Sequence, residues 1–326
     1  MNTPPDDAVR IPAERLRSFT SAVLVAAGMD PGQATVLAGL LTDNDLRGVF
    51  SHGTRQVATY ARDMRAGRLN PRPEVQLAQE GPATLVVDGD GGLGYFPAHR
   101  AAHELIERVA AVGVAVAVTR NHGHIGAAGL YGRILAGAGL IGYVTSGHQM
   151  NLTPGAPFAR AAGGSPHSFA VPAGSEPSFV LDFGAMHDLY DGEPHAPELF
   201  RLAPGLVFRS VGLGAVCQSL GGFLAGVPAD PARAHRRFPG ANQGGFLLAV
   251  DIERFLPRER FLAEMDEYIR RVRALAPMPG FDAAALPGEP EWRRERAWAR
   301  EGVPVGKDHL GARRGIGQEL GVAAPA

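Results

Sequence analysis

The fold is decided by one stretch, residues 112–142, which reads VGVAVAVTRNHGHIGAAGLYGRILAGAGLIG. Its first part, VAVAVTR, is an apolar run of strand length that is rich in branched residues. Upstream, residues 83–94 read ATLVVDGDGGLG, a second strand that ends in a glycine-rich turn. We expect a helix between the two strands, from about Pro97 to Val112. The order of strand, turn, helix and strand predicts an α/β core.

The flanking sequence extends this core and adds helices to it. Apolar residues at helical spacing predict two helices within residues 11–46, joined by the turn MDPGQA, and an amphipathic helix at 261–275. Residues 186–206 are interpreted as a loop, 212–227 as an apolar core helix, and the C-terminal remainder as a tail with one short helix near 291–301. Further buried strands are expected at LIGYVTS (140–146), FAVP (169–172), FVLDF (179–183) and GFLLAVDIERF (245–255).

The chain shows no internal repeat and no low-complexity linker, so we expect its parts to pack as one body. We divide it into three parts: a helical N-terminal lobe, residues 1–75, an α/β core, residues 76–250, and a C-terminal helical segment, residues 251–326, that packs on the core.

Composition narrows the class of partner. Lys and Arg number 32 against 33 Asp and Glu, so no general attraction to nucleic acid or an anionic membrane is implied, and a small molecule is the expected partner. The single cysteine, Cys217, cannot form an internal disulfide, and the first ten residues lack the basic and apolar regions of a signal peptide. No stretch joins about 18 uninterrupted apolar residues. We therefore expect a cytoplasmic protein that does not span a membrane.

The glycine-rich turn Gly89–Gly94, GDGGLG, matches the G-x-G-x-x-G pattern of dinucleotide-binding loops. The next strand, however, ends in Arg120-Asn121 rather than in an acidic residue that would hold a ribose, and Pro97 displaces the helix start from the last glycine. We therefore interpret the turn as a sharp bend between strand and helix rather than as a Rossmann site.

Two histidine clusters carry the candidate chemistry. Ser51, His52, Arg55 and Tyr60 come together if a helix begins at about Thr54, and such a group could hold a carboxylated substrate. The second cluster, residues 121–126 with the sequence NHGHIG, follows a buried strand, where α/β proteins commonly place catalytic groups. A histidine in either cluster, taken alone, is more often a hydrogen-bonded structural residue.

Taken together and in order, these segments resemble the malate/L-lactate dehydrogenase-type family, a non-Rossmann group of nicotinamide-dependent reductases. The resemblance implies a mixed sheet with flanking helices, and a homodimer. The matching stretches cover nearly the whole chain: SHGTRQVATY, GRLNPRPEV, VVDGDGGLG, residues 112–142, FVLDF, AVDIERF and MPGFDAAALPGEPEWRRERAWAREGV.

The resemblance also implies roles for individual residues. His124 matches the catalytic acid/base, His52 the pocket histidine near substrate and nicotinamide, and Tyr60 a substrate-side hydroxyl. Ser51, Arg55 and His148 are further substrate-binding candidates, although the family pattern does not call for His148. Where the family usually carries an arginine four residues after the first histidine, this chain has Gln56, with Arg55 next to it.

These residue types suit the reaction that the family carries out. Reducing a 2-oxo acid or a cyclic imine requires a hydride on carbon and a proton on oxygen or nitrogen. An imidazole with an unperturbed pKa of about 6.5 can supply that proton at neutral pH.

The cofactor half departs from the family pattern. Its Gly-Thr-Asn-Pro loop becomes Gly163-Gly164-Ser165-Pro166, and its Gly-Gly-Tyr-Lys-Gly loop aligns with Leu206-Val207-Phe208-Arg209-Ser210. A long family segment between Asp182 and Pro204 is missing. These changes remove backbone access and a lysine, so NAD or NADP is expected to be held by Gly163–Pro166, Asp182 and Arg209, or to have been lost.

Three hypotheses remain open from sequence. The first is a nicotinamide-dependent oxidoreductase of a small 2-oxo or 2-hydroxy acid or the related imine. The second is a cofactor-independent isomerase, tautomerase or lyase that uses the same histidines. The third is a metal enzyme in which His122 and His124 share one face of a strand, although no acidic ligand motif accompanies them and no metal is expected. Three further histidines depart from the family pattern and mark either drift or a rebuilt pocket: His148, His167 and His187.

Overall fold

The computed structural model describes residues 4, 6–190 and 193–323, and it divides the chain into two units. The first unit joins Met1–Pro73 with Val272–Ala326, and the second is Glu74–Arg271. A division therefore falls inside the C-terminal segment 251–326, and the part from Val272 onward is grouped with the N-terminal lobe.

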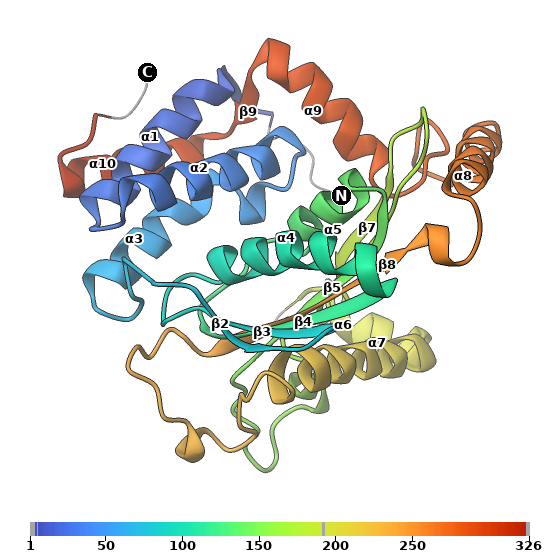
Figure 1. The fold of residues 1–326 in the computed structure, drawn as a ribbon. Coiled ribbons are helices and arrows are strands. Elements are labelled where there is room, and N and C mark those ends of the chain that lie inside the picture. The colour runs from blue at the N-terminus through green and yellow to red at the C-terminus, as the bar shows by residue number, and fades with distance from the viewer. Residues whose placement is uncertain (1–3, 5, 191–192, 324–326) are drawn as a thin grey trace. The chain divides into compact units, whose positions relative to one another are not determined.

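The second unit is built on a seven-stranded sheet with the order β2-β3-β4-β8-β5-β6-β7 (Figure 1). Only β3 and β4 pair in parallel, and the other neighbours are antiparallel, so the sheet is mixed as expected. The strands are β2 (Gln76–Glu80), β3 (Thr84–Asp88), β4 (Val114–His122), β5 (Leu140–His148), β6 (Pro166–Val171), β7 (Phe179–Gly184) and β8 (Gln243–Asp251).

Helices cover both faces of this sheet (Figure 1). On one face lie α4 (Tyr95–Val112), which contacts β4 and β8, and α5 (Gly129–Gly137), which contacts β5 and β6. On the other face lie α7 (Pro204–Cys217) and the π-helical turn that continues it, η4 (Gln218–Phe223). The buried stripe of α4, which includes Leu105 and Val109, recurs at helical spacing and explains why this segment packs as a helix on the sheet.

The first unit is mainly helical and is closed by a short ribbon. Strand β1 (Val9–Ile11) pairs antiparallel with β9 (Val303–Val305), and this ribbon packs with Leu16, Leu46 and Trp298 in one apolar cluster. The predicted turn before α2 is confirmed, because the Asp30 side chain accepts hydrogen bonds from the backbone N–H groups of Gly32 and Gln33. The helices are α1 (Ala13–Ala26), α2 (Pro31–Leu46), α3 (Val57–Arg65), α9 (Glu289–Glu301) and α10 (Lys307–Leu320).

Two sequence interpretations of local structure are wrong. Part of the expected loop at 186–206 is helical, since α6 (Ala196–Leu202) lies within it and α7 begins at Pro204. Each of these helices has a proline in its first turn, where the missing N–H would have no helical partner, so the prolines begin helices here instead of breaking them. The expected C-terminal tail contains α10, whose glycines obscured it and whose Ile316 is fully buried.

The expected core helix at 212–227 also differs from the structure. The helical run starts earlier, at Pro204, and ends at Phe223, and one side of it is exposed rather than buried. Within the described residues, Pro204–Phe223 is the one helical run whose length and composition would let it cross a membrane. In the most apolar 18-residue window of this run, 39% is buried. Core helices of soluble proteins can have the same length and apolar composition.

Candidate functional site

In the second unit His124, His148 and the expected cofactor turn Gly163–Pro166 lie at one edge of the sheet. Strands β4 and β5 both run antiparallel to β8, so their carboxyl ends lie at the same edge, where His122 and His148 both pair with Gln243. The turn after β3 reaches that edge because β3 runs parallel to β4. Pro166 at the start of β6 pairs with Gly184 at the end of β7, which brings the expected cofactor turn to the same edge.

The loop that carries His124 is fixed by backbone hydrogen bonds to the glycine-rich turn Gly89–Gly94. The N–H groups of Gly89, Gly91 and Gly94 donate to the carbonyl oxygens of residues 120, 121 and 124, at 2.9, 2.9 and 3.0 Å, and Gly123 N–H donates back to Gly92 at 2.8 Å. These glycine N–H groups therefore hold the loop and are not directed at a phosphate. This arrangement supports the interpretation of the turn as a structural bend.

His122 is a buried structural residue with both ring nitrogens engaged. Its Nδ1 lies 2.7 Å from the Gly123 carbonyl oxygen, which can only accept, so Nδ1 carries the proton. Its Nε2 therefore accepts from the Thr119 hydroxyl at 2.8 Å. Burial lowers the pKa of His122 to about 4, which keeps the ring neutral at physiological pH. The hypothesis that His122 and His124 share a strand face as metal ligands is wrong, because β4 ends at His122.

His124 lies just beyond the strand, in a half-buried position at the sheet edge. Its ring meets the ring of Tyr95 edge to face, with 6.5 Å between the centroids and 83° between the planes. Tyr95 in turn packs closely on Gly126, where a Cβ atom would lie 2.4 Å from the phenol ring. Tyr95 is not among the site residues predicted from the sequence, although its position directly after the glycine turn indicates that it lies near this loop. The imidazole of His124 is thus held by a rigid loop and an aromatic neighbour.

His148 ends β5 and lies beside the expected cofactor turn. Gln218 holds its backbone, accepting from His148 N–H at 3.2 Å and donating to its carbonyl oxygen at 2.8 Å. A Cβ atom on Gly163 would lie 2.7 Å from Cε1 of His148, so glycine is needed for this close approach. Burial lowers the pKa of His148.

Gln149, next to His148, holds the guanidinium group of Arg236 at this edge of the sheet. Arg236 donates to Oε1 of Gln149, whose amide donates to the Pro228 carbonyl oxygen at 2.6 Å. Burial lowers the pKa of Arg236. Sequence analysis missed Arg236, because nothing in the arginine-rich segment around it distinguishes one arginine from the next.

The remaining cofactor candidates are placed differently from one another. The Asp182 carboxylate on β7 lies close to Gly129 at the start of α5, where a Cβ atom would stand 2.4 Å from its Oδ2. The expected phosphate-facing loop, residues 206–210, is instead part of α7, and Arg209 lies exposed on that helix. The interpretation of residues 206–210 as a loop is therefore wrong, because Pro204 starts a helix there.

His148, His167 and His187 do not form one site with a metal. His167 is buried, with Nδ1 3.0 Å from the Tyr143 hydroxyl and Nε2 3.1 Å from the thiol of Cys217. His187 is exposed and lies 3.7 Å from the Asp188 carboxylate. Across the described part of the chain, no group of three or more His, Cys, Asp or Glu side chains could hold a metal ion.

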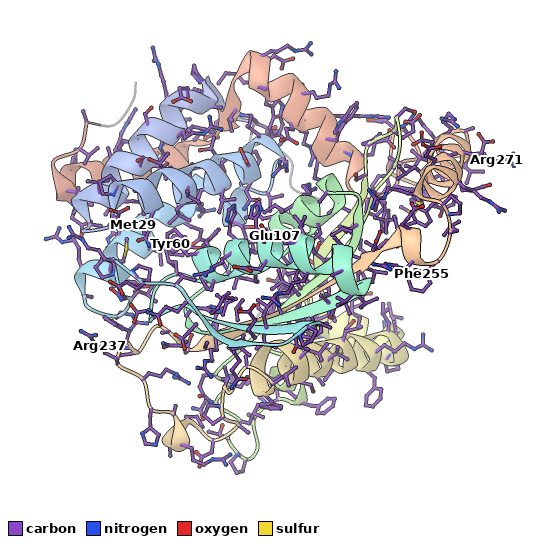
Figure 2. All side chains as sticks on the ribbon, viewed as in Figure 1. Met29, Tyr60, Glu107, Arg237, Phe255 and Arg271 are labelled. Carbon is purple, nitrogen blue, oxygen red and sulfur yellow. The ribbon has the colours of Figure 1, made fainter. Side chains whose placement is uncertain are left out.

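The first unit carries the other half of the predicted residues. The turn from Phe50 to Gln56 consists of two short 3-10 segments, and α3 follows it, as expected for a helix beginning near Thr54. Ser51 Oγ lies 2.8 Å from Nδ1 of His52, and burial lowers the pKa of His52. Tyr60 is buried on α3 (Figure 2), whereas Arg55 is exposed.

Gln56, which stands where the family carries arginine, is occupied in holding the turn. Its amide donates to the Ser51 carbonyl oxygen at 2.7 Å. Gln56 thus stabilises the backbone beside His52, and Arg55 provides the exposed positive charge of the turn.

Comparison with known proteins gives a consistent result. A family model described as malate/L-lactate dehydrogenase matches residues 11–186 and 200–312. A malate dehydrogenase of Pyrococcus horikoshii is 26% identical over 350 residues, covering 97% of each chain. A ureidoglycolate dehydrogenase (NAD(+)) of Escherichia coli O157:H7 is 25% identical over 326 residues, covering 92% of this chain and 93% of that protein. The solved structure of the Pyrococcus horikoshii malate dehydrogenase matches 100% of this chain and 99% of its own, with a TM-score of 0.87 and 24% identity, and so shares the fold.

Proposed function

The chain belongs to the malate/L-lactate dehydrogenase family, and we propose that it works as an NAD- or NADP-dependent enzyme with His124 as its acid/base. As a member of this family it is a dehydrogenase, and its relatives act on small hydroxy or oxo acids. The proposed substrate is a 2-hydroxy acid or its 2-oxo counterpart, or the related cyclic imine.

The contrast between His122 and His124 carries this proposal. His122 is fully buried and has partners on both ring nitrogens, so neither nitrogen can exchange a proton with a substrate. His124 is only half-buried, and its loop is fixed by the hydrogen bonds to the glycine turn. A general acid/base must be both accessible and held in place, and of the two histidines His124 meets both requirements.

The proposed reaction moves one proton through His124. During oxidation the imidazole takes the proton from the substrate hydroxyl as the C–H bond breaks, and during reduction it returns that proton to the carbonyl oxygen or imine nitrogen. A bound nicotinamide would accept or supply the hydride. The proposal assigns substrate contacts to His52 and Tyr60 on the strength of the resemblance. It adds Ser51 and Arg55, which stand in the same turn as His52, and His148, which lies beside the turn at Gly163.

The residues that would hold the cofactor fit it in part. Gly164 has open space beside it, since a Cβ atom there would meet nothing within 4 Å, and backbone can be approached closely at such a position. Asp182 lies two residues before the end of β7, where it pairs with Ser168, and its carboxylate faces Gly129 of α5. Arg209 and its neighbours offer a helix surface instead of a cradle of N–H groups. We therefore expect the cofactor to be held by Gly163–Pro166 and Asp182, more weakly than in a site with a full glycine loop.

The helix at residues 206–210 favours a second candidate function. A cofactor-independent isomerase, tautomerase or lyase would use the same histidines and would need no phosphate cradle. This alternative requires that the substrate be converted without any change in oxidation state.

The two candidates are separated by a binding and turnover experiment on the purified protein. Fluorescence titration with NADH and NADPH should show binding with a dissociation constant above the low micromolar range, because each 1.4 kcal/mol of lost phosphate contact weakens affinity by about tenfold. A panel of 2-hydroxy acids should give reduced nicotinamide in proportion to the acid oxidised. Absence of binding together with conversion in cofactor-free buffer would establish the second candidate instead.

The proposal includes a cytoplasmic homodimer. The exposed side of the α7 region carries a set of large apolar side chains that a second copy of this chain would cover, as in self-complementary interfaces. These side chains are Leu206, Leu213, Val216, Phe223 and Leu224, named here the α7 apolar face.

A further inference from the structure

A buried polar cluster behind the His52 turn has no part in the proposed proton transfer. It consists of Asp45 on α2, Thr54 in the turn, and His309 and Arg313 on α10, and all four belong to the first unit. The exposed fraction of each residue is 6% or less. Polar groups buried this deeply need a structural or functional reason, because removing them from water is unfavourable unless they are paired.

The Asp45 carboxylate holds the turn through two hydrogen bonds from one residue. Oδ2 accepts from the Thr54 backbone N–H at 3.1 Å and from the Thr54 hydroxyl at 2.5 Å. Its other oxygen, Oδ1, lies against Gly53, where a Cβ atom would stand only 1.7 Å away. The backbone directly after His52 can therefore approach the carboxylate only because residue 53 is glycine.

His309 fixes the other side of the Thr54 hydroxyl. Its Nε2 lies 3.0 Å from Oγ1, and the single hydroxyl proton of Thr54 is already donated to Asp45. Nε2 therefore carries a proton and donates it to Oγ1. The hydrogen bonds therefore run in one direction, from His309 to Thr54 and from Thr54 to the carboxylate of Asp45.

Arg313 supplies the positive charge that faces this carboxylate. Its guanidinium packs 4.8 Å above the ring of Phe19, and none of its nitrogens has a hydrogen-bond partner among the described residues. Burial raises the pKa of Asp45 to about 7, and the hydrogen bonds from Thr54 and the charge of Arg313 oppose that rise. Burial and the charges of Arg313 and Arg55 lower the pKa of His309 to about 3, so His309 stays neutral at physiological pH.

A second buried residue of α2 acts on the same turn. Asn44, next to Asp45, donates from its amide to the His52 carbonyl oxygen at 2.8 Å. The last turn of α2 therefore holds the backbone on both sides of Gly53 by hydrogen bonds.

We propose that Asp45 is a positioning residue for His52: it orients the imidazole by holding the turn through Thr54, whose hydroxyl His309 also fixes, while the charge of Arg313 acts on the carboxylate. This inference rests on the proposed function in one respect, that His52 contacts the substrate. Positional errors of about 1 Å at a reacting group can lower turnover about a hundredfold, so a residue that does not touch the substrate can still control turnover.

The test compares Asp45→Asn with Asp43→Asn, a matched change on the same helix at a carboxylate that pairs with Arg17 instead of the turn. We expect Asp45→Asn to lower kcat by tenfold or more with a smaller change in KM, and Asp43→Asn to stay within twofold of wild type. Thr54→Val should also lower kcat, and Thr54→Ser, which keeps the hydroxyl, should restore it. If Asp45→Asn stays within twofold, or loses no more activity than Asp43→Asn, the inference is wrong.

A second readout does not depend on activity. In wild type the side-chain ¹⁵N resonances of His52 should respond to the ionisation of Asp45, and this response should vanish in Asp45→Asn and weaken in Thr54→Val. Unchanged His52 resonances in both variants would overturn the positioning role, even if turnover fell. Full activity of His52→Gln would instead refute the proposed role of His52 while leaving the resonance test of the turn intact. If Asp45→Asn does not fold, the Thr54→Val and Thr54→Ser pair decides.

Discussion

At the scale of single residues, two histidines that are two positions apart serve different purposes. His122 is buried with a partner on each nitrogen, whereas His124 stands half-buried on the loop that follows. We predict that His122→Ala lowers the free energy of unfolding by about 2–4 kcal/mol, because it leaves a cavity and two unpaired polar groups. His124→Ala should change it by less than about 1 kcal/mol.

Urea denaturation of the two variants measures this difference. The comparison is matched, since both changes remove the same side chain, one from the end of β4 and one from the loop that follows it. Equal losses of stability for the two variants would contradict the separate roles assigned to them.

Asp45 gives a prediction for the dependence of stability on pH. Its folded pKa of about 7 lies above the usual value of 3.8, so its contribution to stability is fully present below pH 3.8 and is lost as the pH rises to 7. His309 acts in the opposite sense: its folded pKa of about 3 lies below 6.5, so its contribution is lost as the pH falls from 6.5 to 3. Between pH 4 and 6.5 the contribution of Asp45 to the free energy of unfolding falls as the pH rises, whereas the contribution of His309 increases.

In Asp45→Asn the loss of stability at acidic pH that His309 causes should therefore no longer be compensated. We predict that the free energy of unfolding of Asp45→Asn falls more steeply with falling pH than that of wild type, by about 1.4 kcal/mol per pH unit between pH 4 and 6.5. Denaturant titrations across this range measure both slopes. Parallel curves for the two proteins would mean that Asp45 does not take up its proton in this window.

The sequence motifs and the family resemblance predict His52, His124 and Tyr60 as site residues, and the structure adds contacts that no sequence motif reports. Asp45 and His309 are 264 positions apart, and the fold brings both of them to the hydroxyl of Thr54. Their chemistry depends on burial, which no local pattern reports. Tyr95, which contacts His124, is closer to the predicted site in sequence, since it directly follows the turn Gly89–Gly94.

At the scale of secondary structure, the strands of the sheet were predictable and several helices were not. Runs such as VAVAVTR and FVLDF are apolar, branched and short, and they form β4 and β7 as expected. The helices α6, α7 and α10 were obscured by proline and glycine, which usually interrupt regular structure. Tertiary packing overrides that tendency, as the fully buried Ile316 of α10 shows.

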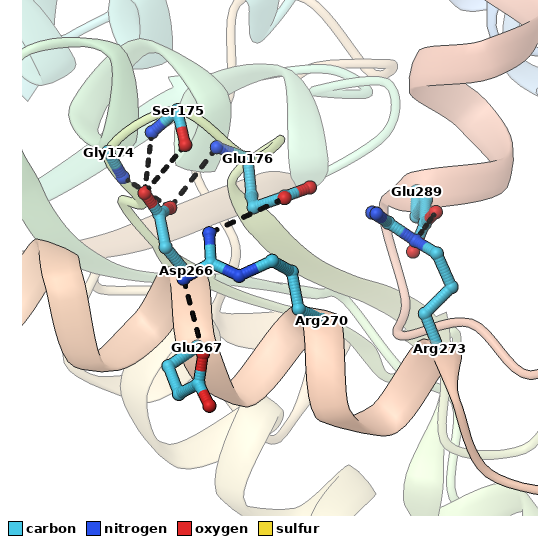
Figure 3. A network of polar contacts seen from close by, with 8 residues as sticks. All are labelled: Gly174, Ser175, Glu176, Asp266, Glu267, Arg270, Arg273 and Glu289. Atoms are coloured by element: carbon cyan, nitrogen blue, oxygen red, sulfur yellow. Dashed lines mark hydrogen bonds and ion pairs between the residues drawn. The ribbon is translucent and has the colours of Figure 1, made fainter.

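The turn between β6 and β7 is held by a single carboxylate of α8 (Arg258–Arg273), shown in Figure 3. Asp266 accepts from the backbone N–H groups of Gly174, Ser175 and Glu176 and from the Ser175 hydroxyl, at 2.8–3.1 Å. Burial acts to raise the pKa of Asp266, but these hydrogen bonds outweigh it and hold the pKa below its usual value. Its contribution to stability is therefore present above pH 3.8 and lost as the pH falls below that value.

We predict that Asp266→Ala lowers the free energy of unfolding by about 2–3 kcal/mol at pH 7, because it leaves three backbone donors without their acceptor. Glu267→Ala, at the neighbouring exposed position, is the control and should leave stability unchanged within error. Thermal or urea unfolding provides the measurement. An Asp266→Ala protein as stable as its control would show that the turn is held by other contacts.

At the scale of the whole molecule, the candidate site is a product of sheet topology. His124, His148 and the turn at Gly163 come from separate segments, and they share an edge because β4 and β5 both flank β8. Strand order cannot be deduced from the strands themselves, so sequence predicted the residues but not their meeting place. The resemblance to a known family supplied what local patterns lacked, and the family match confirms it.

The α7 apolar face gives a prediction for assembly. We predict that wild type is a dimer at micromolar concentration and that the double variant Leu213→Glu, Val216→Glu is a monomer, because two buried charges per protomer would oppose the contact. Val25→Glu, on an exposed apolar position of α1, is the control and should remain dimeric. Light scattering measures the mass. A monomeric wild type, or vesicle binding that depends on α7, would contradict a second copy as the occupant.

The most direct test of the account is the turnover of His124→Ala with a 2-hydroxy acid and its cofactor, with circular dichroism to confirm that the fold is intact. The account predicts that kcat falls by about a hundredfold or more, the usual contribution of a general acid/base. It also predicts that the loss is smallest at high pH, where hydroxide can take the substrate proton. A kcat within about twofold of wild type in the folded variant would contradict the assignment of His124 as the acid/base.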